Sequence, residues 1–531
     1  MRRWNSWGNE NTQSDAKLGP AAVVLLKQLV GEGQCLPNAM MEEVVAKVPA
    51  SRLPEHKLIS RDAEVRLRHA RGQSTPDWLA LRSGEVGVFP DGVAFPENAQ
   101  EVRELLSFAR EQNVSVIPYG GGTSVVGHIN PLEGERPVLT VAMTRMNKLI
   151  ALDKESQIAT FGAGTPGPLV EAQLKEQGYT LGHYPQSWEF ATIGGWVASR
   201  SSGQQSLRYG RIEQLFAGGS FETLNGTLEL PTFPASSAGP DIREMVLGSE
   251  GRMGIISDVK VRVSPIAEKE TFNVVFFPTW VAGVNAVRTL AQQRIQLSMI
   301  RLSNSVETQT HLSMADNREE VAMLEEHLTS KGAGDERVMM TYGLTGSEAQ
   351  YQFAQERALA ISAEFGGVDT GTLLGDHWAG SRFKGPYLRE PLWDAGYVVD
   401  TMETAVNWPE VTKTLDAIEA AISNALSDEG ESVHVYTHLS HVYGQGCSLY
   451  TTYLFRPGTS YAEAYKHWQK LKAAGAEQIV KCGGTISHQH GVGYDHKQYL
   501  PAEKGELGIA AIQSLCELFD PEQRMNPGKL L

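Results

Sequence analysis

The chain has 531 residues, and its 62 Asp and Glu outnumber its 47 Lys and Arg, for a formal net charge of −15. That length predicts two or three domains rather than a single core. An acidic protein of this size is a poor general binder of nucleic acid, so we expect small-molecule substrates and no nucleic-acid partner.

The four cysteines are isolated and form no C-x-x-C pair, and the first residues carry no apolar signal region. Both features predict a reducing, cytoplasmic setting. No apolar stretch is long enough to span a bilayer, although peripheral contact with a membrane stays open.

Residues 1–85 are predicted to form a mostly helical, charged segment in which Trp4 and Trp7 pack against the rest of the protein. Residues 86–266 carry short strands, short helices and repeated glycine turns. Asn98 is a predicted helix N-cap, because apolar residues follow it at helical spacing. This texture predicts an α+β nucleotide-binding domain that is not built on a long parallel sheet.

Residues 267–480 alternate predicted strands with long amphipathic helices, over 281–293, 349–365 and 408–427. This alternation predicts a second domain, in which a sheet packs against helices. Residues 481–531 begin with a histidine-containing motif and end in a helix followed by a short tail.

A glycine-rich loop is the strongest functional signal. Residues 118–124 read Pro-Tyr-Gly-Gly-Gly-Thr-Ser and follow a predicted strand over 114–117. Three glycines let the backbone turn sharply and direct N–H groups at an anion, so we expect this loop to hold a pyrophosphate. A side chain at Gly121 is expected to occupy the phosphate's space. The following β-branched residues predict that the loop runs into a strand, and a ligand-free glycine hairpin is the alternative.

Two further glycine-rich or serine-rich clusters follow within 140 residues. The first runs from 184 to 203 and contains Ile193-Gly-Gly195, and the second is Gly248-Ser-Glu-Gly-Arg-Met-Gly-Ile-Ile256. Each alone is weak, since 192–195 also suits an ordinary helix N-terminus. Together with the 118–124 loop, these two clusters predict one large, extended cofactor that lies across all three.

At this point the chain resembles a known family. The motifs Arg3-Trp-Asn-Ser-Trp-Gly8, 118–124, Gln186-Ser-Trp-Glu-Phe-Ala-Thr192 with the adjoining Ile-Gly-Gly-Trp, and 250–256 resemble FAD flavoproteins of the vanillyl-alcohol-oxidase (PCMH) superfamily. Within that superfamily, the resemblance is to the alkyldihydroxyacetonephosphate synthase (alkylglycerone-phosphate synthase) family, through nearly the whole chain.

The resemblance implies an α+β protein. It has a two-subdomain PCMH-type FAD-binding domain over 86–266 and a substrate (cap) domain over 267–480 with an antiparallel sheet flanked by helices. Residues 1–85 would pack on the FAD domain, and residues 481–531 would carry active-site groups back to it. Relatives are commonly dimers, so a homodimer is expected.

The implied activity is an exchange without net redox change. Non-covalently bound FAD would act through an adduct at flavin N5, and the acyl chain of acyl-dihydroxyacetone phosphate would be replaced by a fatty alcohol to form an ether bond. The second hypothesis is an FAD-dependent 2-hydroxy-acid dehydrogenase or oxidase, and the third is a flavin-binding scaffold without catalysis.

The resemblance also assigns residues. Tyr450, His488 and His490 are the implied catalytic groups, and Arg389 and Arg301 the implied substrate-binding groups. The implied FAD contacts are Pro118, Tyr119, Gly120, Gly121, Gly122, Thr123 and Ser124; Gln186, Ser187, Trp188, Glu189, Phe190, Ala191 and Thr192; Ser199, Arg200, Ser201 and Ser202; and Glu250, Gly251, Arg252, Met253, Gly254, Ile255 and Ile256.

One departure from the family pattern concerns the histidine motif. The family has three consecutive histidines where this chain has His488, Gln489 and His490, on a predicted strand that would give both histidines one face. Gln489 and the Asn-Pro-Gly-Lys tail at 526–529 favour the 2-hydroxy-acid hypothesis. A metal bound by His488, His490 and His496 is a further alternative, although no metal is expected.

Overall fold

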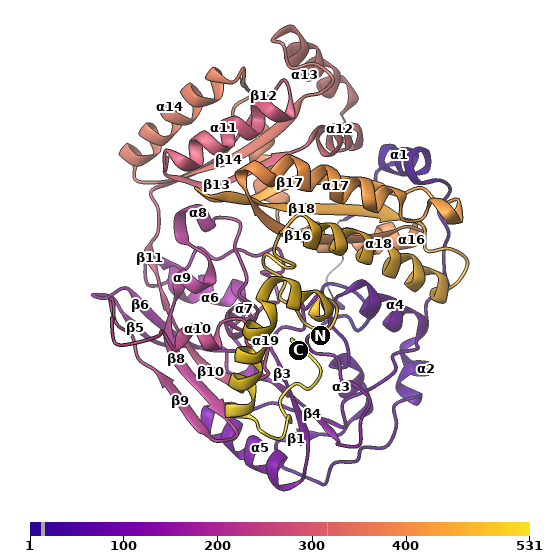
Figure 1. Cartoon of the computed structure of the whole chain (residues 1–531), viewed down its shortest axis with the longest axis vertical. Coiled ribbons are helices and arrows are strands. Elements are labelled where there is room, and N and C mark those ends of the chain that lie inside the picture. Colours follow the sequence, from indigo (N-terminus) through magenta and orange to yellow (C-terminus); the bar gives the residue numbers. More distant parts are fainter. Residues whose placement is uncertain (12–15, 316) are drawn as a thin grey trace.

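The computed structural model describes residues 1–11, 16–315 and 317–531. Three sheets of four or more strands organise it (Figure 1). The first has the strand order β1-β2-β4-β3, in which β2, β4 and β3 are parallel and β1 is antiparallel. Its strands are β1 (Ile59–Ser60), β2 (Gly92–Ala94), β3 (Ser115–Tyr119) and β4 (Val138–Ala142).

Helix α5 (Ala99–Glu111) covers this sheet and begins where the sequence predicts. The Asn98 side chain accepts a hydrogen bond from the Glu101 N–H at 3.0 Å, which satisfies an otherwise unpaired donor of the first turn. Val102, Leu105 and Leu106 are buried on the inner face of α5, so the predicted amphipathic pattern is confirmed.

The second sheet is antiparallel and has the order β5-β6-β10-β8-β9. Its strands are β5 (Leu149–Asp153), β6 (Ile158–Gly162), β8 (Phe216–Thr223), β9 (Gly226–Leu230) and β10 (Ile255–Arg262). Helices α6 (Gly167–Lys175) and α7 (Ile193–Ser199) share its hydrophobic core. One short parallel sheet beside an antiparallel one confirms the predicted α+β class.

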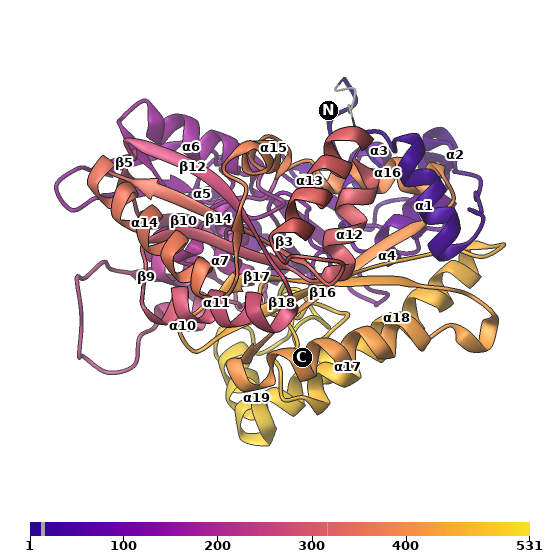
Figure 2. The same ribbon diagram turned by 90° about the horizontal axis from the view of Figure 1, so that it is seen from above.

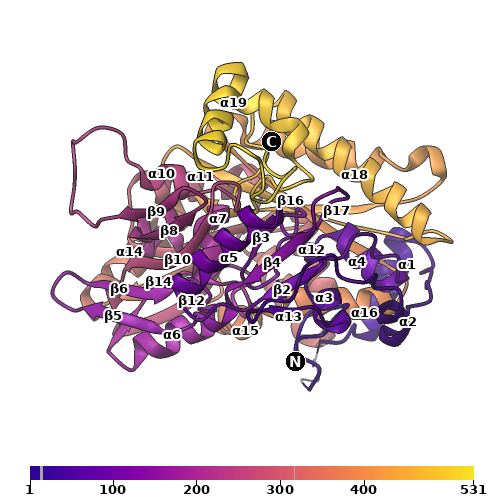
Figure 3. The ribbon, with the colours of Figure 1, turned by 90° about the horizontal axis from the view of Figure 1, so that it is seen from below.

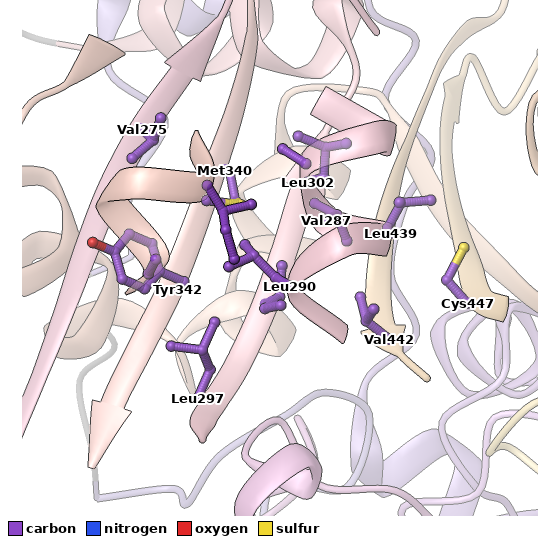
Figure 4. Close-up of a cluster of buried hydrophobic side chains, with 14 of the residues drawn as sticks. Val275, Val287, Leu290, Leu297, Leu302, Met340, Tyr342, Leu439, Val442 and Cys447 are labelled. Atoms are coloured by element: carbon purple, nitrogen blue, oxygen red, sulfur yellow. The ribbon is translucent and has the colours of Figure 1, made fainter. Parts of the chain in front are cut away.

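The third sheet has seven antiparallel strands in the order β15-β12-β14-β13-β17-β18-β16. These are β12 (Lys269–Phe277), β13 (Leu297–Ser303), β14 (Val338–Gly346), β15 (Val368–Asp369), β16 (Val398–Asn407), β17 (His434–Val442) and β18 (Gly446–Phe455). Helices α11 (Trp280–Gln292), α14 (Glu348–Glu364) and α17 (Val411–Asn424) bury their apolar faces with it (Figure 4). The predicted antiparallel sheet with flanking helices is thus confirmed. Figure 2, the view from above, shows α11 and α14 on the face of this sheet that is turned away from the two N-terminal sheets.

The remaining elements lie outside these three sheets and the helices named with them. They are α1 (Pro20–Val30), α2 (Met41–Ala46), α3 (Ala63–Arg68), α4 (Thr75–Ser83), α8 (Ser206–Tyr209), α9 (Ile212–Leu215), α10 (Arg243–Val246), α12 (Ser305–Met314), α13 (Arg318–Ser330), α15 (Leu373–Ser381), α16 (Arg389–Asp394), α18 (Tyr461–Lys481), α19 (Leu500–Phe519), β7 (Tyr179–Thr180) and β11 (Ser264–Pro265), with five short 3-10 turns. No helix in the described part of the chain is long and apolar enough to cross a membrane.

Two predictions about chain segments are wrong. The first 85 residues are not mostly helical: α1 to α4 are separated by irregular stretches, because Pro37, Pro49 and Pro54 cannot continue a helix. Trp7 nevertheless packs as expected and is 6% exposed. The glycine loop does not run into a strand either, since residues 120–137 are irregular.

The C-terminal segment returns to the first half of the chain. Figures 1 and 3 show α19 beside the five-stranded sheet, where Cys516 joins the core of that sheet. Beyond α19, Met525 pairs with Val116 next to the glycine loop. Residues from both chain ends therefore lie near the loop that the sequence singles out.

Candidate active site

A cavity of about 530 Å³ lies where the N-terminal sheets meet the seven-stranded sheet. Its lining residues run from Trp7 to Asn526 and include every residue of the 118–124 loop. The cavity has a polar region of backbone and serine groups. It also has an apolar arm, formed by Leu18, Leu25, Leu26, Leu29, Met314, Leu388, Leu392 and Leu454.

Two of the three loop glycines, Gly120 and Gly121, are needed for contact between two loops. A Cβ at Gly121 would lie 1.8 Å from the backbone oxygen of Phe190, and one at Gly120 would lie 2.4 Å from Thr192 Oγ1. The expectation that a Gly121 side chain would fill the phosphate's space is therefore corrected, because that side chain would strike the neighbouring loop. Glycine lets the 118–124 and 186–192 loops form one continuous wall.

Within the second motif, the lining role is divided. Gln186, Ser187, Ala191 and Thr192 line the cavity, and Thr192 caps α7 by accepting from the Gly195 N–H. The other three residues of this motif do not line the cavity and instead contact residues from other parts of the chain. They are Trp188, Glu189 and Phe190. Trp188 stacks on Phe383 at 4.8 Å, Glu189 accepts from the Tyr387 hydroxyl at 2.8 Å, and Phe190 contacts Trp7 at 5.0 Å.

The remaining predicted cofactor contacts divide in the same way. Ser199, Ser201, Ser202, Glu250, Gly251, Gly254, Ile255 and Ile256 line the cavity. Arg200 instead pairs with Glu244 at 3.0 Å, Arg252 donates to the Met525 carbonyl at 2.7 Å, and Met253 is buried in the core. Ser202 and Ser249 line the cavity, and their buried hydroxyls have no hydrogen-bond partner among the described residues. Unpartnered buried hydroxyls on a glycine-lined wall fit a polar, phosphate-bearing cofactor.

Tyr450 comes from β18 and lines the opposite wall. Its hydroxyl donates to Thr401 Oγ1 at 3.1 Å, and its ring stacks on His438 with centroids 5.0 Å apart. Burial raises the pKa of Tyr450 to about 12. The phenol therefore keeps its proton at neutral pH unless a bound ligand changes its surroundings.

The two predicted substrate arginines differ in their partners. Arg301 is paired with Glu307 at 2.7 Å. Burial would raise the pKa of Glu307, but Arg301 and His438 outweigh it and hold that pKa well below its usual value. The guanidinium charge of Arg301 is thus already neutralised by the protein.

Arg389 lines the cavity without an acidic partner. Its guanidinium donates to the Gln73 carbonyl at 2.6 Å and to Thr75 Oγ1 at 3.3 Å, and lies 4.8 Å from the Trp78 ring centroid. No carboxylate in the described part of the chain forms an ion pair with it. Burial lowers the pKa of Arg389. A half-buried cation that forms no ion pair with a described carboxylate is suited to binding an anion.

The prediction that His488 and His490 share one strand face is wrong. Residues 484–496 are irregular, so the alternation of a strand does not apply. His490 lines the cavity, edge-on to Tyr450 at 6.1 Å. His488 lies outside the lining, and its Nε2 accepts from Arg211 and from the Tyr443 hydroxyl, each at 2.7 Å. Burial lowers the pKa of His488 to about 4, so this imidazole is neutral.

A carboxylate behind the wall connects several of these groups. Glu403 Oε1 lies 3.1 Å from His488 Nδ1, and Glu403 Oε2 accepts from Gln489 at 2.5 Å. Among the described residues, Glu403, His441 and His488 bring ligand atoms within 4.8 Å of one another, whereas His490 and His496 stay apart from this group. The proposed histidine ligand set is therefore wrong. Arg211 beside His488 also disfavours a cation there.

Sequence reasoning missed His438, His441 and Glu403. His438 and His441 gave a signal, because three histidines fall within residues 434–441, a stretch about as long as one strand. Glu403 gave none, since a single acid within a strand is ordinary.

Comparisons with known proteins agree with this geometry. Family models described as "FAD binding domain" and "FAD linked oxidases, C-terminal domain" match residues 90–229 and 266–530. Alkyldihydroxyacetonephosphate synthase of Dictyostelium discoideum is 31% identical, over 93% of this chain and 82% of that protein. The Trypanosoma brucei brucei enzyme of that name is 30% identical, over 89% of this chain and 78% of that protein.

A solved structure of an alkyldihydroxyacetonephosphate synthase has a TM-score of 0.84, at 27% identity, and covers 99% of this chain and 98% of that one. The glycine-lined wall and its unpartnered hydroxyls suit the FAD that these family models describe. The chain is therefore an FAD-dependent enzyme that belongs to the alkyldihydroxyacetonephosphate synthase family.

Proposed function

We propose that this protein forms an ether bond by exchanging the acyl chain of acyl-dihydroxyacetone phosphate for a fatty alcohol. The observation that carries this proposal is one cavity with two kinds of wall. It combines Arg389, a half-buried cation that forms no ion pair with any described carboxylate, with an arm of leucine side chains. A molecule with a phosphate at one end and a long hydrocarbon chain at the other can place its phosphate at Arg389 and its chain along the leucine side chains.

The roles of the protein groups follow from their positions. Arg389 would hold the substrate phosphate, and Arg301, paired with Glu307, would keep Tyr450 and His438 in place. Tyr450 would carry the proton that leaves and returns to C1 of the substrate, and His490 would line the same space. The cofactor contacts would be those motif residues that line the cavity.

Bound FAD, held without a covalent link, would supply an electron-accepting ring beside the carbon that exchanges its substituent. The protein's own contribution is positioning, exclusion of water by the leucine arm and proton transfer. A 2-hydroxy acid is the second candidate substrate, because Arg389 suits a carboxylate too. Such a small acid leaves the leucine arm unused, which favours the ether-forming reaction.

Access of fatty substrates suggests contact with a membrane surface. Leu29 of α1 lines the cavity and is 38% exposed, and Val24 on the same helix is 56% exposed. We therefore propose that α1 borders the entrance and rests on a lipid surface. A cytoplasmic location and a homodimer remain predictions.

The test is incubation of the purified yellow protein with palmitoyl-dihydroxyacetone phosphate and a labelled fatty alcohol. The expected result is a labelled ether product together with released palmitate and no loss of the flavin's visible absorbance. Anaerobic bleaching of the flavin by a 2-hydroxy acid, with no ether product, would replace this proposal by the second candidate.

A further inference from the structure

His441 lies at a break in the regular pairing of β17. The register between β17 and β18 shifts between Leu439 and Val442, and the His441 N–H donates to Ser448 Oγ at 2.9 Å instead of to a strand partner. In a regular strand, Ser440 and His441 would point to opposite faces. Here both line the cavity, as expected of a bulge that turns an extra side chain toward a site.

The proton on the His441 ring is on Nδ1. Ser440 donates its only hydroxyl hydrogen to Glu403 Oε1 at 2.8 Å, so its oxygen can only accept from His441 Nδ1, 2.6 Å away. Glu403 Oε1 is itself 3.3 Å from the same nitrogen. With acceptors on the Nδ1 side, Nδ1 carries the hydrogen and Nε2 keeps a free lone pair.

That Nε2 atom is buried and has no partner. His441 is 5% exposed, and Nε2 makes no hydrogen bond to any described residue. His441 lines the cavity, and Nε2 is its ring nitrogen that no described residue occupies. Burial would raise the pKa of Glu403, but the neighbouring His488 and His441, which hydrogen-bond to its carboxylate, hold that pKa well below its usual value, so Glu403 is ionised. The carboxylate can therefore stabilise an imidazolium if His441 gains a proton.

Two neighbouring histidines lack this combination, and a third, His438, shares only part of it, because its Nδ1 lies between Glu307 Oε1 at 3.0 Å and the Arg301 guanidinium at 3.2 Å. His488 shares Glu403, but its Nε2 already accepts from Arg211 and Tyr443. His490 lines the cavity but forms no ion pair with a carboxylate of the described chain. His467 is buried and does not line the cavity. Its Nε2 lies 2.9 Å from Glu429 Oε2, and its Nδ1 lies 3.1 Å from the Arg456 carbonyl oxygen.

We propose that His441 accepts the hydroxyl proton of the incoming fatty alcohol, with Glu403 and Ser440 as positioning residues. This inference rests on the proposed function. In that reaction the C1 carbon has two hydrogens in both substrate and product, so the proton handled by Tyr450 must return to C1. The net reaction releases one proton, and the alcohol O–H proton needs an acceptor at the moment when the new C–O bond forms.

The step balances in atoms and electrons. The alcohol O–H bond breaks, its proton goes to His441 Nε2, and the oxygen's electron pair forms the new C–O bond. The acyl chain leaves as a carboxylate that needs no proton, and the imidazolium later releases its proton to solvent. No oxidant or reductant is consumed.

The first experiment compares His441→Gln with a matched control, His467→Gln, in the full-length, FAD-loaded protein. Gln keeps a side chain that can bond to Ser440 but cannot accept a proton. We expect the rate of ether formation to fall about 100-fold, the usual effect of removing a general base, while release of palmitate without alcohol stays near the wild-type rate. The control should retain both rates per bound flavin.

A second variant protects the test against misfolding. His441→Ala opens space at the bulge, so added imidazole should restore part of its ether formation, while imidazole should do nothing for His467→Ala. Glu403→Gln should slow ether formation less than His441→Gln does, because it leaves the accepting nitrogen in place.

The tautomer of the His441 ring can be measured by NMR without any turnover. In the full-length protein labelled with 15N-histidine, the resonance that His441→Gln removes should show hydrogen on Nδ1 and none on Nε2 at neutral pH. A hydrogen on Nε2, or near wild-type ether formation by flavin-loaded His441→Gln, would overturn the assignment of His441 alone. A wild-type protein that makes no ether would overturn the proposed function and this assignment with it.

Discussion

Replacement of Gly121 by Ala tests the idea that two loops must touch to make the FAD wall. The added Cβ would lie 1.8 Å from the Phe190 carbonyl oxygen and 2.6 Å from its carbonyl carbon. Both are backbone atoms, so no side chain can swing aside to make room. The glycine loop would have to retreat by about 1.2 Å merely to reach the shortest separation that a Cβ tolerates.

The magnitude follows from this displacement. Binding groups work within about 0.5 Å of their proper position, so N–H groups of the loop would miss the diphosphate. Loss of two hydrogen bonds to a charged oxygen, at about 1.5–3 kcal/mol each, weakens binding by about 3–6 kcal/mol. That change corresponds to a roughly 10²- to 10⁴-fold rise in the Kd for FAD.

The assay is the ratio of flavin to protein after gel filtration, followed by titration of the apoprotein with FAD. Gly134→Ala is the matched control, because a Cβ at Gly134 meets no atom within 4 Å. The control should bind FAD as the wild type does. A Gly121→Ala protein whose Kd for FAD lies within about threefold of the wild-type value would refute the loop-contact argument.

Three further predictions concern single side chains. Tyr450→Phe removes the hydroxyl 3.1 Å from Thr401; FAD should stay bound while turnover falls about 100-fold or more, and undiminished turnover would exclude Tyr450 from proton transfer. Arg389→Met should raise the KM for the phosphate-bearing substrate about 10- to 100-fold at constant FAD content, and an unchanged KM would remove Arg389 from phosphate binding. Burial raises the pKa of Glu419 to about 7, so the native state holds this proton more tightly than the unfolded chain does. The resulting stability is complete below the unfolded pKa of about 4.3 and is lost as the pH rises through 7. The free energy of unfolding of Glu419→Gln, measured by urea denaturation, should therefore be about 1–2 kcal/mol higher than that of wild type at pH 8, after allowance for partial exposure. At pH 5 the two proteins should differ little, and equal stability at pH 8 would contradict the burial argument.

Features governed by local rules were predictable from the sequence. The helix after Asn98, the strand leading into residues 118–124, and a sheet packed against amphipathic helices follow from capping, glycine chemistry and periodicity. These signals lie within a few residues of the structure they specify. The antiparallel pairing of that sheet was implied by the family resemblance.

Features that depend on long-range packing were not predictable. His441 reaches the cavity through a break in strand register, and His488 turns away from it toward Arg211, which is 277 residues distant along the chain. The need for Gly121 comes from the carbonyl of Phe190, about which the loop's own sequence carries no information. A periodic pattern predicts a face, but it cannot predict a bulge or an irregular segment.

Both ends of the chain contribute to the flavin wall. Arg2 donates to the Gly121 carbonyl, and Asn526, which lines the cavity, donates to the carbonyls of His128 and Glu250. A nascent chain still on the ribosome lacks the second of these contributions. If this wall holds FAD as proposed, we expect tight binding of FAD only after the segment around Asn526 has been synthesised and has folded against the carbonyls of His128 and Glu250.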